Sequence, residues 1–333
     1  MTVIDVHAHV TAPAELGNYR AGLLASRGGH TRSPLKVSDE RIEGSLKAHL
    51  TEMTHHQIDL QLISPRPYTV MHWAKPEKIV RWYTEETNNL IARECQLHPN
   101  TFKGVCTLPQ APGVSPKFWV DELERCVKDL GFVGVQINPD PAEMGDDSTP
   151  AMGDEYWYPL YEKMVELNVP GLVHSAGCQS ERLIFHLHFI NEESIAIMSL
   201  LDSDVFEIFP SLKLVISHGG GAIPYQIGRF MAQWESHDER FDHALRKLYF
   251  DTCLYTKRSM ELLLDTVGVD RCMFGTEVPG AGSHAHPDTG LPMDDLVPLI
   301  KSIDWLTDED RYKIFEGNAR SLYSLGAPVG AMA

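Results

Sequence analysis

Short apolar runs recur along this chain, and segments with helical periodicity separate most of them. The runs are continuous and rich in β-forming residues, so they predict buried strands. The segments between them predict amphipathic helices, because apolar residues return there every three or four positions. The predicted strands cover residues 3–6, 60–64, 102–107, 133–137, 171–174, 214–217, 248–252 and 272–276, and the clearest predicted helices cover residues 85–97, 118–130, 156–167 and 194–208.

Continuous apolar strands that alternate with helices predict a parallel sheet, and eight such units predict a closed (β/α)₈ TIM barrel. An open, doubly wound sheet is the alternative architecture. That sheet normally has a glycine-rich phosphate-binding turn after its first strand, whereas this chain has His7-Ala8-His9-Val10 there. No repeat, low-complexity tract or linker divides the sequence. We therefore expect residues 1–333 to form one α/β barrel domain.

Three long segments follow predicted strands directly: residues 11–39, 138–154 and 278–292. Loops that follow strands lie on the catalytic face of a (β/α)₈ barrel, so we expect these segments to surround an active site. Near the C-terminus, Thr307-Asp308-Glu309-Asp310 predicts the capped start of a closing helix that continues to Tyr323.

Five potential metal ligands stand at the ends of predicted strands. His7 and His9 are two positions apart on the first strand, so their imidazoles share a face. His174, His218 and Glu277 each follow a further strand. Imidazole and carboxylate groups that converge from several strands suit a divalent metal, and zinc is the expected ion. His218 has two open roles, as a ligand or as an acid, base or hydrogen-bond donor beside the metal.

No lysine follows the fourth strand, which ends in Gln136-Ile137-Asn138. A bridging lysine would be needed to hold a second metal close to the first, so we expect one metal ion per chain. His284 and His286 form another His-x-His pair, but they lie in a glycine-rich segment, which favours a loop role over ligation. His55, His56 and His98 have no comparable placement and are expected to be solvated.

Arg66 follows the second strand and can present two parallel N–H donors to a carboxylate. Tyr225 and Arg229 follow the glycine run after His218, where a helix is expected, and are candidates for substrate contact. Lys47, on a predicted helix before the second strand, is a further candidate for a substrate carboxylate. Each of these residues could equally have a structural role.

Composition narrows the class of protein. The 333 residues, 43% of them hydrophobic, can bury a large core. A formal net charge of -17 argues against nucleic acid and anionic membrane surfaces as partners. No apolar stretch is long enough for a membrane span, and no signal peptide is recognisable. The six cysteines show no C-x-x-C spacing, so we expect free thiols and a cytoplasmic protein.

The residues at the strand ends resemble those of the amidohydrolase superfamily, and specifically its amidohydrolase-2 branch of one-metal decarboxylases and hydratases. Gly317-Asn318-Ala319-Arg320 is also typical of that branch. Most members carry Asp on strand eight, whereas this chain has Phe274-Gly275-Thr276-Glu277, which is similar to the 4-oxalomesaconate hydratases. Further similar stretches are residues 64–66, 88–93, 104–110, 138–141, 161–167 and 218–222.

The resemblance implies a metal-dependent barrel with zinc held by His7, His9, His174 and Glu277. It implies a hydro-lyase that converts 4-oxalomesaconate to 4-carboxy-4-hydroxy-2-oxoadipate in the degradation of aromatic compounds, with Glu277 as the proton carrier. His218 would assist catalysis. We expect a homo-oligomer that acts on a small polycarboxylate.

The chain departs from the resemblance at residues 283–292 and 186–193, both near the expected substrate pocket; Asn191, in the second stretch, is a candidate substrate contact. The alternative activities are a nonoxidative decarboxylase of an aromatic or muconate-type acid and a metal-dependent hydrolase. A metal-binding module without activity is the alternative from another class of protein. Its metal site should be closed by four protein ligands, with no pocket beside it.

Overall fold

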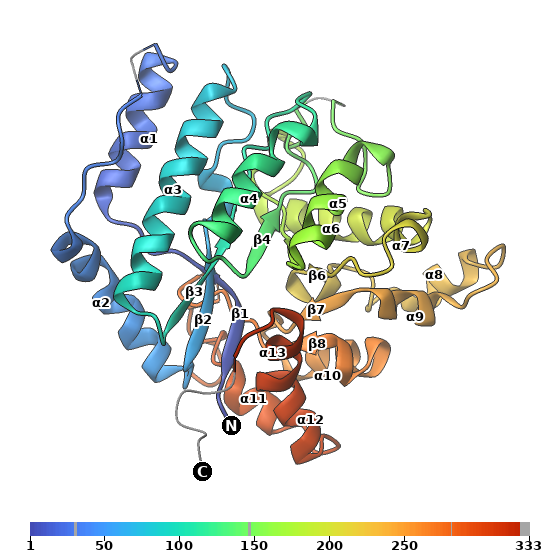
Figure 1. Ribbon diagram of the computed structural model, residues 1–333. Coiled ribbons are helices and arrows are strands. Elements are labelled where there is room, and N and C mark those ends of the chain that lie inside the picture. Colours follow the sequence, from blue (N-terminus) through green and yellow to red (C-terminus); the bar gives the residue numbers. More distant parts are fainter. Residues whose placement is uncertain (30–31, 146–147, 281, 327–333) are drawn as a thin grey trace.

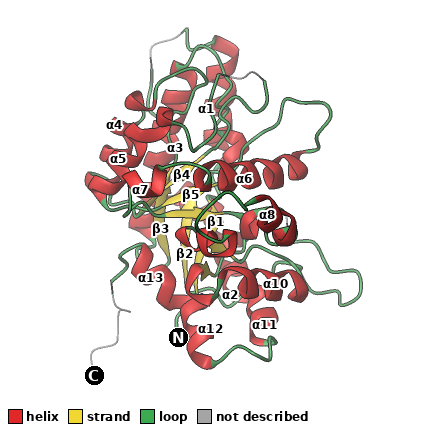
Figure 2. Ribbon diagram, turned by 90° about the vertical axis from the view of Figure 1, so that its right-hand side faces the viewer, coloured by secondary structure: helices red, strands yellow, loops and turns green. Residues whose placement is uncertain are grey.

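The computed structural model describes residues 1–29, 32–145, 148–280 and 282–326. Within them, eight parallel strands pair in sequence order to form one sheet at the centre of the molecule, with helices around it (Figures 1 and 2). The strands are β1 (Ile4–His9), β2 (Leu60–Ser64), β3 (Phe102–Cys106), β4 (Gly134–Ile137), β5 (Gly171–Val173), β6 (Leu214–Ile216), β7 (Tyr249–Asp251) and β8 (Cys272–Met273).

The sheet curls so that its first and last strands meet. The Val6 amide donates a hydrogen bond to the Phe274 carbonyl (2.9 Å), and the Glu277 amide donates to the His7 carbonyl (2.7 Å). These bonds join the end of β8 to β1. The predicted (β/α)₈ barrel is therefore confirmed, and the open doubly wound sheet is wrong.

Helices cover the outside of the barrel, and most of the large apolar side chains lie between them and the strands. The predicted helix 194–208 begins earlier, at Phe185, and is interrupted after Leu201. The helices are α1 (Ala14–Ser26), α2 (Asp39–His55), α3 (Lys78–Leu97), α4 (Val120–Lys128), α5 (Tyr158–Leu167), α6 (Phe185–Leu201), α7 (Val205–Ile208), α8 (Ile227–Gln233), α9 (Phe241–Ala244), α10 (Lys257–Val267), α11 (Leu296–Lys301), α12 (Asp308–Tyr312) and α13 (Asn318–Leu322).

The three predicted loops all follow strands, but the first of them is not all loop, since it contains α1. Parts of these predictions lie outside the described residues: positions 30–31, 146–147 and 281 of the loops, and positions 327–333 of the predicted domain.

The predicted closing helix has the expected cap and an unexpected interruption. The Thr307 hydroxyl accepts a hydrogen bond from the Asp310 amide (3.1 Å), and the Asp310 carboxylate accepts one from the Thr307 amide (2.9 Å), which forms a capping box. A π-helical turn at Lys313–Gly317 then separates α12 from α13.

The barrel interior is apolar at its lower end, the end at which the strands begin. Side chains from several strands meet there, among them Ile4, Val6, Leu62 and Leu172, and α13 covers them with Leu322 and neighbouring residues. None of the described helices combines the length and the apolar character needed to cross a membrane. All six cysteines lie in the described residues, and none forms a disulfide.

Candidate active site

A bulge in β1 brings both histidines of the His-x-His pair into the barrel mouth. The pairing of β1 with β2 shifts register between Asp5 and Ala8. An extra residue of this kind changes which side chains face the interior. Val6 packs in the lower apolar layer, and His7, the next residue, also faces inward, with its ring 5.2 Å from that of His9. Strict alternation would have placed Val6 and His7 on opposite faces.

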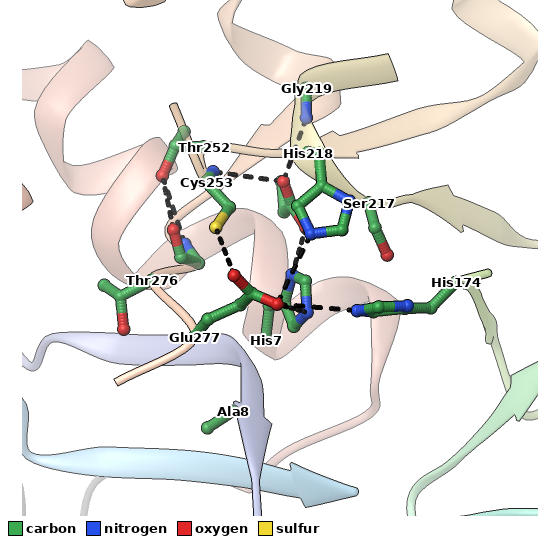
Figure 3. A network of polar contacts seen from close by, with 12 residues as sticks. His7, Ala8, His174, Ser217, His218, Gly219, Thr252, Cys253, Thr276 and Glu277 are labelled. Atoms are coloured by element: carbon green, nitrogen blue, oxygen red, sulfur yellow. Dashed lines mark hydrogen bonds and ion pairs between the residues drawn. The ribbon is translucent and has the colours of Figure 1, made fainter. Parts of the chain in front are cut away.

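Four imidazoles surround one carboxylate oxygen of Glu277 at the mouth of the barrel. Figure 3 shows three of these rings and the carboxylate pointing toward one another. The Glu277 Oε1 atom lies 3.7 Å from Nε2 of His7, 3.6 Å from that of His9, 3.6 Å from that of His174 and 3.4 Å from that of His218.

Each of these imidazoles is held through its other ring nitrogen, Nδ1, by a group outside the cluster. This arrangement fixes the orientation of the rings and turns every Nε2 toward Glu277, as is usual around protein metal sites. The Nδ1 contacts are His7 with Asp251 Oδ2 (2.6 Å), His9 with Ser64 Oγ (3.1 Å), His174 with the Ser175 carbonyl (2.6 Å) and His218 with Glu193 Oε1 (2.8 Å).

The cluster fits a divalent metal ion. The buried Nε2 atoms of His7 and His174 have no hydrogen-bond partner among the described residues, and an unpaired buried polar atom is costly. A metal would satisfy both. The ligand atoms of His7, His174, His218 and Glu277 lie within 4.8 Å of one another. His9 is outside this most compact set, although its Nε2 lies equally near the Glu277 oxygen.

Burial and nearby charges shift the pKa values of these imidazoles in opposite directions. Burial lowers the pKa of His9 to about 4 and that of His174 to about 3, which leaves both rings neutral and able to bind a metal. Burial opposes charge on His218 as well, but the carboxylates of Glu193 and Glu277 raise its pKa well above the usual value. The pKa of Glu277, which burial would raise, is held well below its usual value by the nearby imidazoles, above all by the charge of His218.

Two of the site residues have backbone conformations that side chains rarely adopt. The φ angles of His218 and Glu277 are 50° and 63°, both in the left-handed region. Strain of this kind persists where the surrounding structure holds it, and it gathers at functional sites. The glycine after His218 is required sterically, because a Cβ on Gly219 would lie 2.6 Å from the Leu254 side chain.

A cavity of about 450 Å³ opens above the cluster. Its walls include the aromatic rings of Phe185 and Phe189 from α6 and of Tyr255 after β7. Phe189 packs against the cluster itself, with its ring 5.1 Å from His174 and stacked on His218 at 5.7 Å. The cavity therefore offers an apolar surface next to the polar cluster, as substrate pockets commonly do.

Of the predicted substrate-binding residues, Arg66 lines this cavity, and one of its terminal nitrogens donates to the Pro279 carbonyl (2.8 Å). Lys47 is exposed on α2, and Arg229 is exposed on α8. Tyr225 is 78% exposed. These three side chains do not line the cavity, because α2 lies in the outer layer and the segment after His218 forms turns before α8 begins. Asn191, on α6, is also outside the lining.

The remaining histidines follow the expectations in part. His284 is exposed and His286 partly exposed, and neither belongs to the ligand cluster. His56 was expected to be solvated, but it is buried, with Nε2 3.1 Å from Asp294 Oδ1. The expectation was wrong because the loop after β8 folds back over the end of α2.

Three residues around the cluster were not predicted from the sequence. Asp251 ends β7 and could have been found as a polar residue at a strand end. Its second carboxylate oxygen accepts hydrogen bonds from the amides of Gly219 (3.1 Å) and Cys253 (3.0 Å). Glu193, on α6, and Tyr255, whose hydroxyl donates to Glu277 Oε2 (3.0 Å), gave no such signal.

A sequence model of the amidohydrolase family matches residues 4–325. A 2-keto-4-carboxy-3-hexenedioate hydratase from Sphingobium sp. is 36% identical over 97% of this chain and 96% of its own length. The crystal structure of 4-oxalomesaconate hydratase from Rhodopseudomonas palustris is also 36% identical, covers 97% of this chain and 96% of that one, and superposes with a TM-score of 0.87.

A more distant relative is a gamma-resorcylate decarboxylase from Polaromonas sp., which is 27% identical over 82% of this chain and 85% of its own. The match to the family model extends over nearly the whole barrel and includes every residue of the His/Glu cluster. The chain therefore belongs to the amidohydrolase family.

Proposed function

We propose that this protein is a metal-dependent hydro-lyase that hydrates a carbon–carbon double bond conjugated to a ketone in a small polycarboxylate. The observation that carries the proposal is the Glu277 carboxylate, ringed by imidazoles at the base of a cavity that also contains Arg66. The 36% identity with two hydratases over nearly the full chain supports it. The preferred substrate is 4-oxalomesaconate, and the product is 4-carboxy-4-hydroxy-2-oxoadipate.

In this proposal one divalent ion, zinc, is held by His7, His9, His174 and Glu277. Imidazole nitrogens and carboxylate oxygens are usual ligands of zinc. When bound, the ion lowers the pKa of water and stabilises negative charge on a nearby oxygen. His218 is the alternative to His9 as the third imidazole ligand, because its ligand atom belongs to the most compact set. We expect His9→Ala to lose the metal and His218→Ala to retain it, as measured by metal analysis.

The protein groups are arranged to move one proton. Hydration adds the oxygen of water to one alkene carbon and a proton to the carbon next to the ketone. Glu277 is the proposed carrier that receives the proton from water and delivers it to that carbon. The Tyr255 hydroxyl donates a hydrogen bond to Glu277 Oε2 and so orients the carboxylate for this transfer. His218, held by Glu193, is placed to donate a hydrogen bond to the enolate oxygen as charge develops there.

Arg66 is the proposed clamp for one substrate carboxylate. Its guanidinium is half-buried beside the cavity and can bind a carboxylate through two parallel hydrogen bonds. The aromatic rings of Phe185 and Phe189 would exclude water from the carbon chain of the substrate. Both effects allow a protein of charge -17 to bind an anion locally.

One assay separates hydration from the rival decarboxylation. The purified protein is incubated with 4-oxalomesaconate while loss of the conjugated chromophore and release of carbon dioxide are followed together. A hydratase removes the chromophore without releasing carbon dioxide. Carbon dioxide released in proportion to the lost chromophore would identify a decarboxylase instead, and no change in either signal would reject this substrate.

We propose a cytoplasmic enzyme because the cysteines are free thiols, four of them buried. We also propose that residues 1–333 act as one catalytic domain, which the family match over residues 4–325 supports, and that the enzyme is a homo-oligomer. Gel filtration with light scattering measures the last property directly.

A further inference from the structure

A second group of potential metal-binding side chains lies between α6 and the loop after β4, and none of its members belongs to the His/Glu cluster. It consists of Asp140, His188 and Glu192, whose ligand atoms all lie within 4.8 Å of one another. His188 and Glu192 are four residues apart on α6, so their side chains share one face of the helix. Asp140 comes from the loop after β4. The group therefore spans two elements that are distant in the sequence.

His188 is the residue that points to a ligand. Its side chain is fully buried, yet neither ring nitrogen has a hydrogen-bond partner among the described residues. A buried imidazole with two unsatisfied nitrogens is unfavourable unless something else binds one of them. Burial lowers the pKa of His188 to about 4, so the ring is neutral, which is the form that binds metals.

The two carboxylates are close to the imidazole and to each other. The Asp140 oxygens accept hydrogen bonds from the amides of Ala142 (3.1 Å) and Met144 (2.6 Å), which fix the direction of this carboxylate. Burial raises the pKa of Glu192 to about 7, and the charge of Asp140 adds to the effect. A cation between the two groups would remove their repulsion. Asp140 and Glu192 also line a cavity of about 280 Å³, which gives an ion a route of entry.

We propose that Asp140, His188 and Glu192 form a second divalent-cation site that ties the loop after β4 to α6. One imidazole and two carboxylates suit Zn²⁺ or Mn²⁺ better than Mg²⁺ or Ca²⁺, which prefer oxygen ligands alone. Ligands bound at about 2.1 Å to one ion lie roughly 3–4 Å apart, so the side chains need to close in only slightly. The site is independent of the proposed hydratase activity.

Such a site would stabilise the wall of the catalytic cavity. The neighbouring face of α6 carries Phe189, which packs on His174 and His218, and Glu193, which holds His218 through Nδ1. An ion at Asp140, His188 and Glu192 would fix the position of this helix. Its role is structural, and it would act on the barrel mouth only through the helix.

The experiment counts Zn²⁺ bound per chain after the protein has been stripped with a chelator and titrated with the ion. We expect the wild-type chain to bind two ions, and Glu192→Gln and His174→Ala to bind one each. The double variant should bind none. Glu207→Gln, an exposed position on α7, is the matched control and should bind two. His188→Gln serves as the second variant of the new site and should bind one.

Thermal unfolding provides a measurement that is independent of ion counting and of activity. In the His174→Ala background, added Zn²⁺ should raise the unfolding midpoint in proportion to the logarithm of its concentration, because it binds only the folded chain. The double variant should show no such rise. A wild-type chain that binds one ion, or a Glu192→Gln variant that binds as many as the Glu207→Gln control, would overturn the second site. Loss of activity without these changes would bear on the proposed function alone.

Discussion

The two ends of the barrel interior are lined by the same strands, but one end is apolar and the other is polar. At the lower end, Ile4 and Val6 of β1 pack with other apolar side chains beneath α13. At the upper end, His7 and His9 of the same strand meet Glu277 in a cluster that contains unpaired buried nitrogens. The bulge between Asp5 and Ala8 contains both Val6 and His7, and it marks the change from apolar to polar side chains along β1.

This difference implies that the lower end stabilises the folded barrel, whereas the mouth reduces its stability. The lower layer buries apolar surface and leaves few polar groups unsatisfied, so it contributes to folding directly. The mouth holds buried polar groups and two left-handed backbone positions, His218 and Glu277, which cost free energy in the absence of a bound ion or substrate. We therefore expect substitutions at the mouth to reduce catalysis and substitutions below it to reduce stability.

The largest expected effect is on turnover at the mouth. Glu277→Gln keeps the size of the side chain and one oxygen ligand, but it removes the charge and the ability to carry a proton. We expect kcat to fall at least about a hundredfold, with a smaller effect on metal content. Steady-state kinetics and metal analysis on the same preparation measure both. Turnover near the wild-type value would mean that Glu277 carries no proton.

The matching change at the lower end is Leu322→Ala on α13. Leu322 is 3% exposed against the apolar layer, so truncation leaves a cavity there. We expect the free energy of unfolding to fall by about 3 kcal/mol while kcat of the folded enzyme stays within roughly twofold. Urea unfolding measures the first quantity, and Ser321→Ala, at an exposed neighbouring position, is the control. A parallel loss of kcat would mean that the two ends are coupled.

The third prediction tests substrate capture at the mouth. Arg66→Lys keeps the positive charge but loses the planar fork that binds a carboxylate through two hydrogen bonds. We expect kcat/KM to fall by an amount equivalent to about 2 kcal/mol, the size of a charged hydrogen bond. Metal content should not change. If kcat/KM is unaffected, the contact between Arg66 and the Pro279 carbonyl is its only role.

The smallest expected effect concerns the outer edge, where His56 at the end of α2 binds Asp294 after β8. The hydrogen bond to Asp294 raises the pKa of His56 to about 9, despite burial. Because the folded pKa exceeds the unfolded value of 6.5, this contribution to stability is complete below pH 6.5 and is lost as the pH rises through 9. We expect roughly 1–2 kcal/mol of the free energy of unfolding to be lost in this way.

Urea unfolding at pH 6 and pH 9 checks this prediction. The difference in stability between the wild-type protein and His56→Gln should shrink at the higher pH. His55→Gln, at the exposed neighbouring histidine, should match the wild type at both pH values. A difference that does not depend on pH would show that His56 is not charged in the folded protein.

Local sequence determined the elements of this fold and most of the chemistry at the strand ends. Each of the eight strands was recognisable because a strand covered on both faces must be continuously apolar. The strand ends of a parallel barrel share one face, so His7, His9, His174, His218 and Glu277 could be grouped from the sequence alone. The capping box at Thr307 was predictable for a similar reason, since both partners lie within one turn.

Only the tertiary structure decided what depends on contacts between distant segments. The bulge in β1 needs β2 beside it, and the contact of Glu193 with His218 needs α6 to lie over β6. Lys47, Tyr225 and Arg229 do not line the described cavity. The sequence could not show this, because a position on a helix does not say which face meets a cavity formed by other segments. Local rules fix the conformation and burial of one element, whereas the partners of a buried polar group come from wherever the chain returns.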